Sequence, residues 1–331
     1  MSTESEPGPG ITADSGAQSD REANRRARRV LLGCAAITVI TTLAIFFVLI
    51  DNAASYFFGA RITEILLGAS VERTVTFTEF FTGTRWAPDH ATPAHGALPV
   101  IFGTLVITVG AAFVSIPIGT ATAIYLSEYA SPGVRSKLKP TLEVLAGIPT
   151  IVYGYFAIAF INPVVLAPIA DALFGINLGR YSMLSGMLVV GIMTIPMVSS
   201  ISEDAMSAVP DDLRNGAYAL GATKYDVSTR IVLPASISGV FASYILAVSR
   251  AIGETMAVTL AAGFNANITA SPFDEIMTMT AYMVSMARGT TAVGTVEYQS
   301  LFAVGLLLFV MTLAMNLLND QLKRRFQEEY Q

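Results

Sequence analysis

Long stretches without any charged residue alternate along this chain with short segments that carry several charges. The run 30–50 contains no Asp, Glu, Lys or Arg, and ~20 apolar residues in a helix are enough to cross ~30 Å of hydrocarbon. Charged residues make up 14% of the chain, against about 25% in an ordinary soluble domain. Because hydrocarbon offers no hydrogen bonds, a single segment must satisfy its own backbone groups as a helix. The sequence therefore predicts an all-α, polytopic membrane protein.

Six transmembrane spans are predicted within a membrane domain that covers residues 30–320. The spans are 30–50, 98–126, 144–170, 181–202, 235–264 and 300–319. The apolar piece 276–287 is too short to cross and suits a re-entrant or interfacial helix. A signal peptide is the alternative for the first run, but its apolar part is shorter and no small-residue cleavage pattern follows Ile50. We therefore expect an uncleaved first span.

The two ends of the chain and the basic residues predict the orientation. Residues 1–29 are rich in Ser, Glu, Gly and Arg, which predicts a flexible tail, and 321–331 form a short C-terminal tail. The N-terminal tail holds five basic residues, and three each lie in the loops after the second and fourth spans and in the C-terminal tail. The longer loops on the other side hold only five. Because Lys and Arg concentrate on the cytoplasmic side, both termini are expected there.

Several classes of function are excluded or disfavoured by composition. A net charge of -5 provides no basic surface for nucleic acid. The single cysteine, Cys34, allows no intrachain disulfide and no cysteine-based metal site. Asp89, His90 and His95 are a weak metal signal because no third firm ligand or helical spacing supports them. Both histidines lie in that one loop, so no Ser/His/Asp or Cys/His arrangement for catalysis is available. We expect that this chain binds no metal and no cofactor and that it is not an enzyme.

The loop 207–234 carries the signals of two short helices that meet at a corner. Pro210 suits a first helical position, and the two aspartates after it place negative charge at the positive end of the helix dipole. Gly221 is able to adopt the left-handed conformation that ends a helix. Thr223 and Asp226 have the spacing of a capping box, which predicts the start of a second helix, and Pro234 ends the segment. An ordinary cytoplasmic connector is the alternative interpretation.

The spacing within this loop resembles the EAA motif of ABC importer permeases, in which Glu-Ala-Ala is followed by Gly and later by Ile-x-Leu-Pro. The corresponding residues are Asn215, Gly216, Ala217, Gly221, Ile231, Leu233 and Pro234. Asn215 replaces the usual Glu, and Gly216 replaces an Ala and should weaken the helix by ~0.5–1 kcal/mol. The resemblance implies the type I permease fold and a loop that couples to a separate ATPase. We call residues 207–234 the coupling loop.

Two further blocks are similar to phosphate-specific permeases of the PstC family. They are residues 146–155 and 250–258. The resemblance, which covers the chain from about residue 30, implies a phosphate importer in the cell membrane and in contact with its lipid. It also implies a companion permease of PstA type, an ATP-binding subunit of PstB type and an extracytoplasmic binding protein of PstS type. The chain has no Gly-x-x-x-x-Gly-Lys-Ser/Thr loop, so ATP and Mg are expected on the partner ATPase. In the third span, Gly147 and Pro149 predict a helix kink.

Arg250 and Glu254 are the only charged residues expected inside the spans, and such residues usually face a bundle interior or a water-filled path. At helical spacing, small residues fall near the same face, which permits either close helix packing or a cavity. They are Gly239, Ser243, Ala247, Ala257 and Ala261. We expect Arg250 to attract the anion and Glu254 to neutralise Arg250 when no anion is bound. The alternative role for the two residues is a static pair that only fixes helix packing. The alternative functions for the chain are a permease for sulfate, molybdate or phosphonate and an intramembrane enzyme, for which the charged groups are too few.

Overall fold

The structure is a computed structural model that describes residues 13–62, 75–289 and 291–328. The chain divides into two units, 1–51 and 52–331. Residues 1–12 of the predicted N-terminal tail and 329–331 of the C-terminal tail lie outside the described residues.

Helix α1 (Ala13–Phe58) contains the first predicted span and most of the predicted tail. It is one helix of 46 residues, so residues 13–29 are helical in this structure. Its stretch Asn24–Phe58 is long and apolar enough to cross a membrane. The large apolar side chains between Val30 and Ile50 are exposed, which suits a helix surrounded by hydrocarbon.

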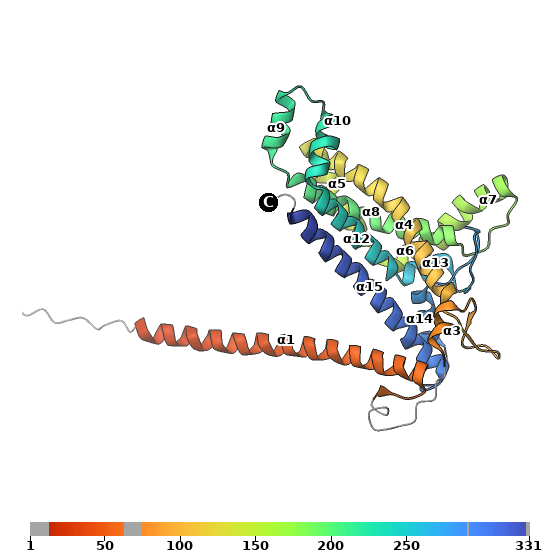
Figure 1. The fold of residues 1–331 in the computed structure, drawn as a ribbon. Helices are drawn as coiled ribbons and strands as arrows, with labels where there is room; N and C mark the ends of the chain where they lie inside the picture. Colours follow the sequence, from red (N-terminus) through yellow and green to blue (C-terminus); the bar gives the residue numbers. More distant parts are fainter. Residues whose placement is uncertain (1–12, 63–74, 290, 329–331) are drawn as a thin grey trace, which may run out of the picture. The chain divides into compact units, whose positions relative to one another are not determined.

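The second unit is a bundle of helices with one small hairpin (Figure 1). Among the described residues of this unit, the α-helices after α1 are α3 (Phe77–Thr82), α4 (Leu98–Ile124), α5 (Pro132–Ala146), α6 (Thr150–Phe156), α7 (Ala167–Phe174), α8 (Met183–Ser207), α9 (Asp211–Ala219), α10 (Lys224–Val227), α11 (Leu233–Ala235), α12 (Ile237–Ile252), α13 (Met256–Ala262), α14 (Met279–Arg288) and α15 (Val296–Glu328). Three π-helical segments continue neighbouring helices: η1 (Tyr125–Tyr129), η2 (Ala157–Leu166) and η3 (Ser228–Val232). The strands β1 (Trp86–Ala87) and β2 (Ala94–His95) pair antiparallel, Trp86 opposite His95.

The arrangement of the bundle confirms the all-α membrane fold. Helix α4 packs along α8, and α12 packs against α8, α4 and α15. Within the described part of the chain, five helices are long and apolar enough to span, and a sixth span results if the bent pair Lys224–Ala235 and Ile237–Ile252 counts as one. The predicted spans 98–126, 181–202 and 300–319 correspond to α4 with η1, to α8 and to α15.

The third span begins later than predicted. Helix α5 ends at Ala146, and α6 begins at Thr150. Gly147 follows α5 and Pro149 precedes α6, so the expected kink is a complete break. Proline disfavours a helical conformation in the residue before it, which prevents the helix from continuing through this point. The span therefore runs from α6 through η2 and α7, and 144–146 belong to α5.

The predicted fifth span, 235–264, is divided in the structure. Helix α12 ends at Ile252, and α13 begins at Met256 after a turn. Helix α13 packs against α6 and α8, whereas α12 packs against α8, α15 and α4. The short helix predicted at 276–287 is α14, whose Met279 and Ala281 are fully buried. Its first turn therefore packs inside the bundle, while its last residues, Ala287 and Arg288, are exposed.

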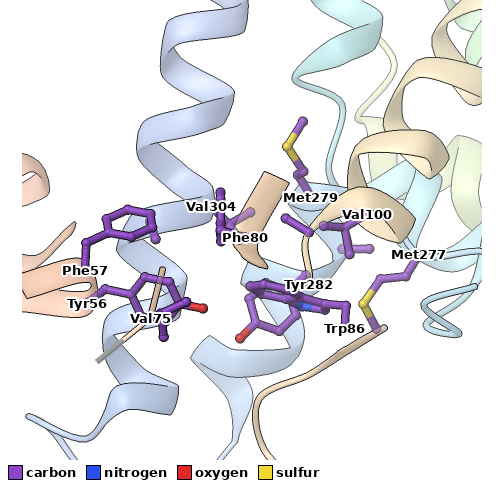
Figure 2. Close-up of a cluster of buried hydrophobic side chains, with 13 residues drawn as sticks. Tyr56, Phe57, Val75, Phe80, Trp86, Val100, Met277, Met279, Tyr282 and Val304 are labelled. Carbon is purple, nitrogen blue, oxygen red and sulfur yellow. The ribbon is translucent and has the colours of Figure 1, made fainter. Parts of the chain in front are cut away.

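The hairpin end of the unit has an aromatic core (Figure 2). The Trp86 ring meets Tyr282 of α14 edge to face, with 4.9 Å between ring centroids. Tyr56 and Phe80 meet in the same way at 5.9 Å. This core joins residues 52–58 of α1, the hairpin, α14 and α15, and it fixes the end of the bundle opposite the coupling loop.

Candidate functional site

The turn between α12 and α13 places Arg250 and Glu254 in different surroundings. Arg250 lies in the last turn of α12 and is exposed, as are Gly253 and Met256. Its guanidinium is close enough to the Tyr153 hydroxyl of α6 for electrostatic interaction. Glu254 is 7% exposed. The exposed side of the turn therefore presents the positive charge of Arg250, while the Glu254 side chain is buried.

Glu254 is a helix cap in this structure. Its Oε1 accepts a hydrogen bond from the Ala257 N–H at 3.1 Å, within the first turn of α13. A carboxylate is favoured there because unpaired N–H groups and the helix dipole make that end positive. The Glu254 carbonyl oxygen accepts from Thr280 of α14 at 2.7 Å. Among the ion pairs of the described residues none joins Arg250 to Glu254, so the predicted neutralising contact is not formed.

The small residues of α12 serve close packing against α8. A Cβ built on Gly239 would lie 2.4 Å from the Ala205 Cβ. The hydroxyls of Ser243 and Ser202 share a hydrogen bond of 2.8 Å. Ala247 is buried as well, at 3% exposure. Of the two uses predicted for this face, the structure shows close helix packing, and Arg250 lies beyond its end.

Replacing Gly239 with valine is expected to destabilise the bundle by about 1–3 kcal/mol, as overpacking of a tight contact does. The reason is the missing space between α12 and α8 at Ala205. Thermal unfolding of the purified complex in detergent measures the effect. A Cβ at Gly133 of α5 meets nothing within 4 Å, so Gly133→Ala is the control and should not lower the midpoint. An equal midpoint in Gly239→Val would contradict the packing argument.

The coupling loop has the predicted two-helix corner. Helix α9 ends before Gly221, whose φ of 84° is in the left-handed region. Thr223 caps α10: its hydroxyl oxygen accepts from the Asp226 N–H at 3.2 Å, and its hydroxyl donates to the Asp226 carboxylate at 2.6 Å. That hydroxyl hydrogen bond lowers the pKa of Asp226. After Pro234 the chain bends by 73° into α12. The local signals in the sequence were therefore sufficient to predict this geometry.

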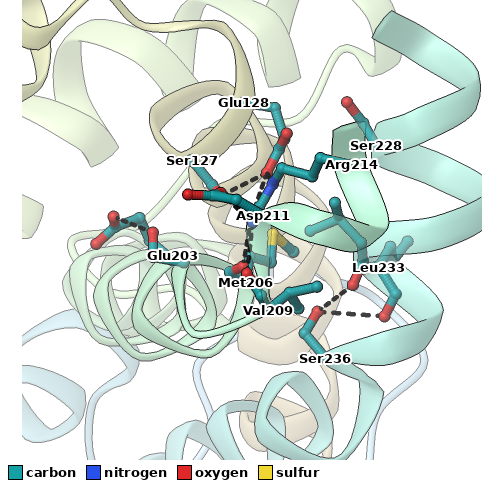
Figure 3. Close-up of polar contacts among 12 residues, drawn as sticks. Ser127, Glu128, Glu203, Met206, Val209, Asp211, Arg214, Ser228, Leu233 and Ser236 are labelled. Atoms are coloured by element: carbon teal, nitrogen blue, oxygen red, sulfur yellow. Dashed lines mark hydrogen bonds and ion pairs between the residues drawn. The ribbon is translucent and has the colours of Figure 1, made fainter. Parts of the chain in front are cut away.

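Arg214 fastens α9 to the ends of two spans (Figure 3). Its Nε and one terminal nitrogen donate to the Glu128 carboxylate of η1 at 3.3 and 3.1 Å. It also donates to the carbonyl oxygens of Met206 at 2.8 Å and Val209 at 2.5 Å, near the end of α8. The side chains of Arg214 and Glu128 are 13% and 4% exposed. No pattern in the sequence indicated this pair.

A second charged group joins α5 to α8. Glu203 is fully buried and pairs with Arg135 and with Lys139, the latter at 2.7 Å. Lys139 also binds Asp204 at 2.6 Å, and its hydrogen bonds to Asp204 and Glu203 raise the pKa of Lys139. Glu203 follows the predicted fourth span directly, and its position beside a basic loop was the only available sequence signal.

Apolar side chains project from the outer face of the coupling loop. Leu220 is 90% exposed and Tyr225 is 67% exposed, while Ala217 and Val227 are buried beneath them with Met206. Asn215 and Gly216 of the motif lie on the exposed side of α9. Ile231 and Leu233 pack partly against the buried cluster. The loop thus has a fixed base and an exposed surface.

Potential metal ligands do not gather in the described residues: no group of three or more His, Cys, Asp and Glu side chains is close enough to hold an ion. Asp89 contacts His90 at 3.1 Å. His95 instead shares a hydrogen bond of 3.0 Å with the Tyr56 hydroxyl.

Comparison with known proteins agrees with this architecture. Residues 115–328 match the family described as binding-protein-dependent transport system inner membrane component. The chain is 33% identical over 300 residues to the probable ABC transporter permease protein YqgH of Bacillus subtilis (strain 168), covering 91% of each chain. It is 34% identical to the phosphate transport system permease protein PstC of Mesorhizobium japonicum, covering 70% of this chain and 74% of that one.

Solved structures share the fold at low sequence identity. A bacterial ABC transporter involved in the import of the acidic polysaccharide alginate aligns with a TM-score of 0.62 and 14% identity, covering 93% of this chain and 98% of that chain. The MetNI methionine ABC transporter in an inward facing conformation aligns with a TM-score of 0.51 and 16% identity, covering 68% and 94%. The family match, the relatives and the multi-span bundle together show that this chain is a multi-pass membrane permease of the family of binding-protein-dependent transport system inner membrane components.

Proposed function

We propose that this chain is one permease subunit of an ABC importer for inorganic phosphate and forms half of the path through the membrane. The observation that carries the proposal is the set of relatives named PstC, at 33 and 34% identity in Xylella fastidiosa (strain 9a5c) and Mesorhizobium japonicum. The companion permease of PstA type forms the other half. An extracytoplasmic binding protein of PstS type delivers the anion.

Arg250 is the residue that we assign to the path. It is exposed at the turn between α12 and α13, where Glu254 is turned inward to cap α13. A guanidinium donates two parallel hydrogen bonds to a phosphate oxyanion, which suits it to this substrate. Since a mid-membrane charge is costly unless it faces a partner or a water-filled space, the exposed side of Arg250 is where the path belongs. Glu254 then acts by holding the turn in position.

The coupling loop binds a separate ATP-binding subunit of PstB type, which holds ATP and Mg. Its exposed Leu220 and Tyr225 supply an apolar docking surface, and its buried base connects that surface to α8 and α12. A rigid corner of this kind is able to pass a rigid-body movement of the ATPase to the spans. Asn215 offers an amide where the EAA motif has a carboxylate, so the contact there is made without a negative charge.

Transport of labelled phosphate tests the proposal. The four kinds of subunit are assembled in vesicles, and uptake is measured with ATP and competing sulfate, molybdate or phosphonate. Phosphate should be imported only when ATP and the binding protein are both present, and the competing anions in about tenfold excess should leave most of the uptake intact. Preferential uptake of another oxyanion would overturn the substrate assignment and retain the permease.

Both termini and the coupling loop are proposed to be cytoplasmic, on the basis of the basic residues. The test uses four exposed positions, each replaced singly with cysteine: Ser131, Thr223, Gln321 and Thr92. With Cys34→Ser as background, an impermeant thiol reagent added outside intact cells should label only the cysteine at Thr92. Permeabilised cells supply the control, since all four should then react. Outside labelling at Thr223 would reverse the orientation and remove the coupling assignment.

A further inference from the structure

The π-helical end of the second span, η1, contacts both helices of the coupling loop. Its Glu128 binds Arg214 of α9 through two nitrogens. Its next residue, Tyr129, lies under the ammonium of Lys224 in α10, 5.2 Å from the ring centroid. Helices α9 and α10 are connected through Gly221, and the loop that they form joins α8 to α12. Their contacts with η1 therefore link this loop to a third span, α4, which is not adjacent to it in sequence.

Several hydrogen bonds and burial hold the Glu128 side chain in one position. The carboxylate oxygen that accepts from Arg214 also accepts from the Ser127 hydroxyl at 2.9 Å. The two charged side chains are almost completely buried. Because its guanidinium also binds the carbonyl oxygens of Met206 in α8 and of Val209 just after that helix, Arg214 holds η1, α8 and α9 in one arrangement. Truncating one partner of such a buried pair is costly because it leaves the other charge uncompensated, so the two side chains stay together.

The conformation of η1 singles it out from the rest of the second span. The Ala130 N–H donates to the Tyr125 carbonyl oxygen at 2.8 Å, which is the wider π-helical hydrogen bond. Such turns are uncommon and frequently occur at functional positions. Here the wider turn lies where Glu128 and Tyr129 meet the coupling loop.

We propose that Glu128 and Tyr129 are positioning residues that pass the movement of the coupling loop to the second span, so that α4 moves together with α8 and α12 in each ATPase cycle. The inference rests on the proposed function only in requiring a partner ATPase, and it holds for any transported anion. When the coupling loop moves, its Arg214 and Lys224 displace η1 through their contacts with Glu128 and Tyr129.

Coupling in the assembled transporter tests this role. We choose Glu128→Gln, which keeps the shape and removes the charge, and Tyr129→Leu, which removes the ring from a half-exposed side chain. Both variants should co-purify with the ATP-binding subunit and hydrolyse ATP at the basal rate. Phosphate imported per ATP, and stimulation of hydrolysis by the loaded binding protein, should each fall about tenfold, within the usual range of coupling between sites.

Asp211→Asn is the matched control, because Asp211 contacts the same arginine at 3.1 Å but is 87% exposed. An exposed pair contributes little, so this variant should couple normally. Wild-type uptake per ATP in both Glu128→Gln and Tyr129→Leu would overturn the proposal. Loss of co-purification in both would also overturn it, since η1 would then only support ATPase docking. If the wild type imports an anion other than phosphate, the phosphate assignment fails while uptake of that anion per ATP still tests η1.

Discussion

Replacing Arg250 with glutamine is expected to abolish phosphate uptake while the subunits still assemble. Glutamine keeps part of the hydrogen-bonding capacity but removes the charge that attracts the anion. Because Arg250 is exposed and forms no ion pair with Glu254, its loss leaves no buried carboxylate without a partner. We expect a loss of at least about 100-fold in uptake, since the guanidinium is able to donate two charge-assisted hydrogen bonds to the anion and each contributes about 1.5–3 kcal/mol.

The double variant Arg250→Gln, Glu254→Gln separates the path role from a static pair. If the two residues only fixed packing as a pair, neutralising both should restore assembly and uptake together. The structure leads us to expect assembly without uptake. Glu254→Gln alone should retain partial uptake, because an amide oxygen is still able to accept from the Ala257 N–H. Uptake is measured in vesicles and assembly by co-purification, and full uptake by the double variant would end the path hypothesis.

Replacing Gly221 with valine is expected to uncouple ATP hydrolysis from uptake. No atom lies within 4 Å of a Cβ at this position, so steric overlap is not the reason. The φ of 84° is the reason, because a left-handed conformation costs an ordinary L-residue about 1–2 kcal/mol and a β-branched one more. The corner between α9 and α10 should therefore open, and uptake per ATP should fall about tenfold or more.

Gly216 provides the matched control for this variant. It lies in α9, its added Cβ also meets nothing within 4 Å, and its φ is not positive. Gly216→Ala should couple normally and strengthen α9 by about 0.5–1 kcal/mol. Uptake and hydrolysis are measured on the same vesicle preparation, with insertion checked by the amount of membrane-embedded chain. Normal uptake per ATP in Gly221→Val would remove the corner from the coupling mechanism.

Local patterns predicted the parts of this protein whose structure is decided locally. The left-handed Gly221, the Thr223 cap and the end of the segment near Pro234 each depend on a residue and its near neighbours, and all three are present. The apolar runs predicted the spans for the same reason, since length and hydrophobicity suffice to define them. Span ends were less accurate where a break such as Gly147 to Pro149 lies inside an apolar stretch.

The candidate site was predicted less well because its geometry depends on tertiary contacts. The expectation that Arg250 and Glu254 pair assumed one continuous helix, in which residues four apart are neighbours. The turn after Ile252 turns Glu254 toward α13 and α14 instead. The contact between Arg214 and Glu128 joins residues 86 positions apart, so no periodicity in the sequence indicates it.

Helix α12 has the dimensions of a lever arm. It begins beyond the 73° bend that connects it to the coupling loop, and Arg250 is near its other end. At ~1.5 Å of rise per residue, Arg250 lies about 20 Å along the axis from Ile237. A tilt of about 10° at the bend would displace Arg250 by about 3 Å, roughly the length of one hydrogen bond. In the proposed mechanism, a small rotation at the ATPase would be enough to make or release a direct contact between this arginine and an anion.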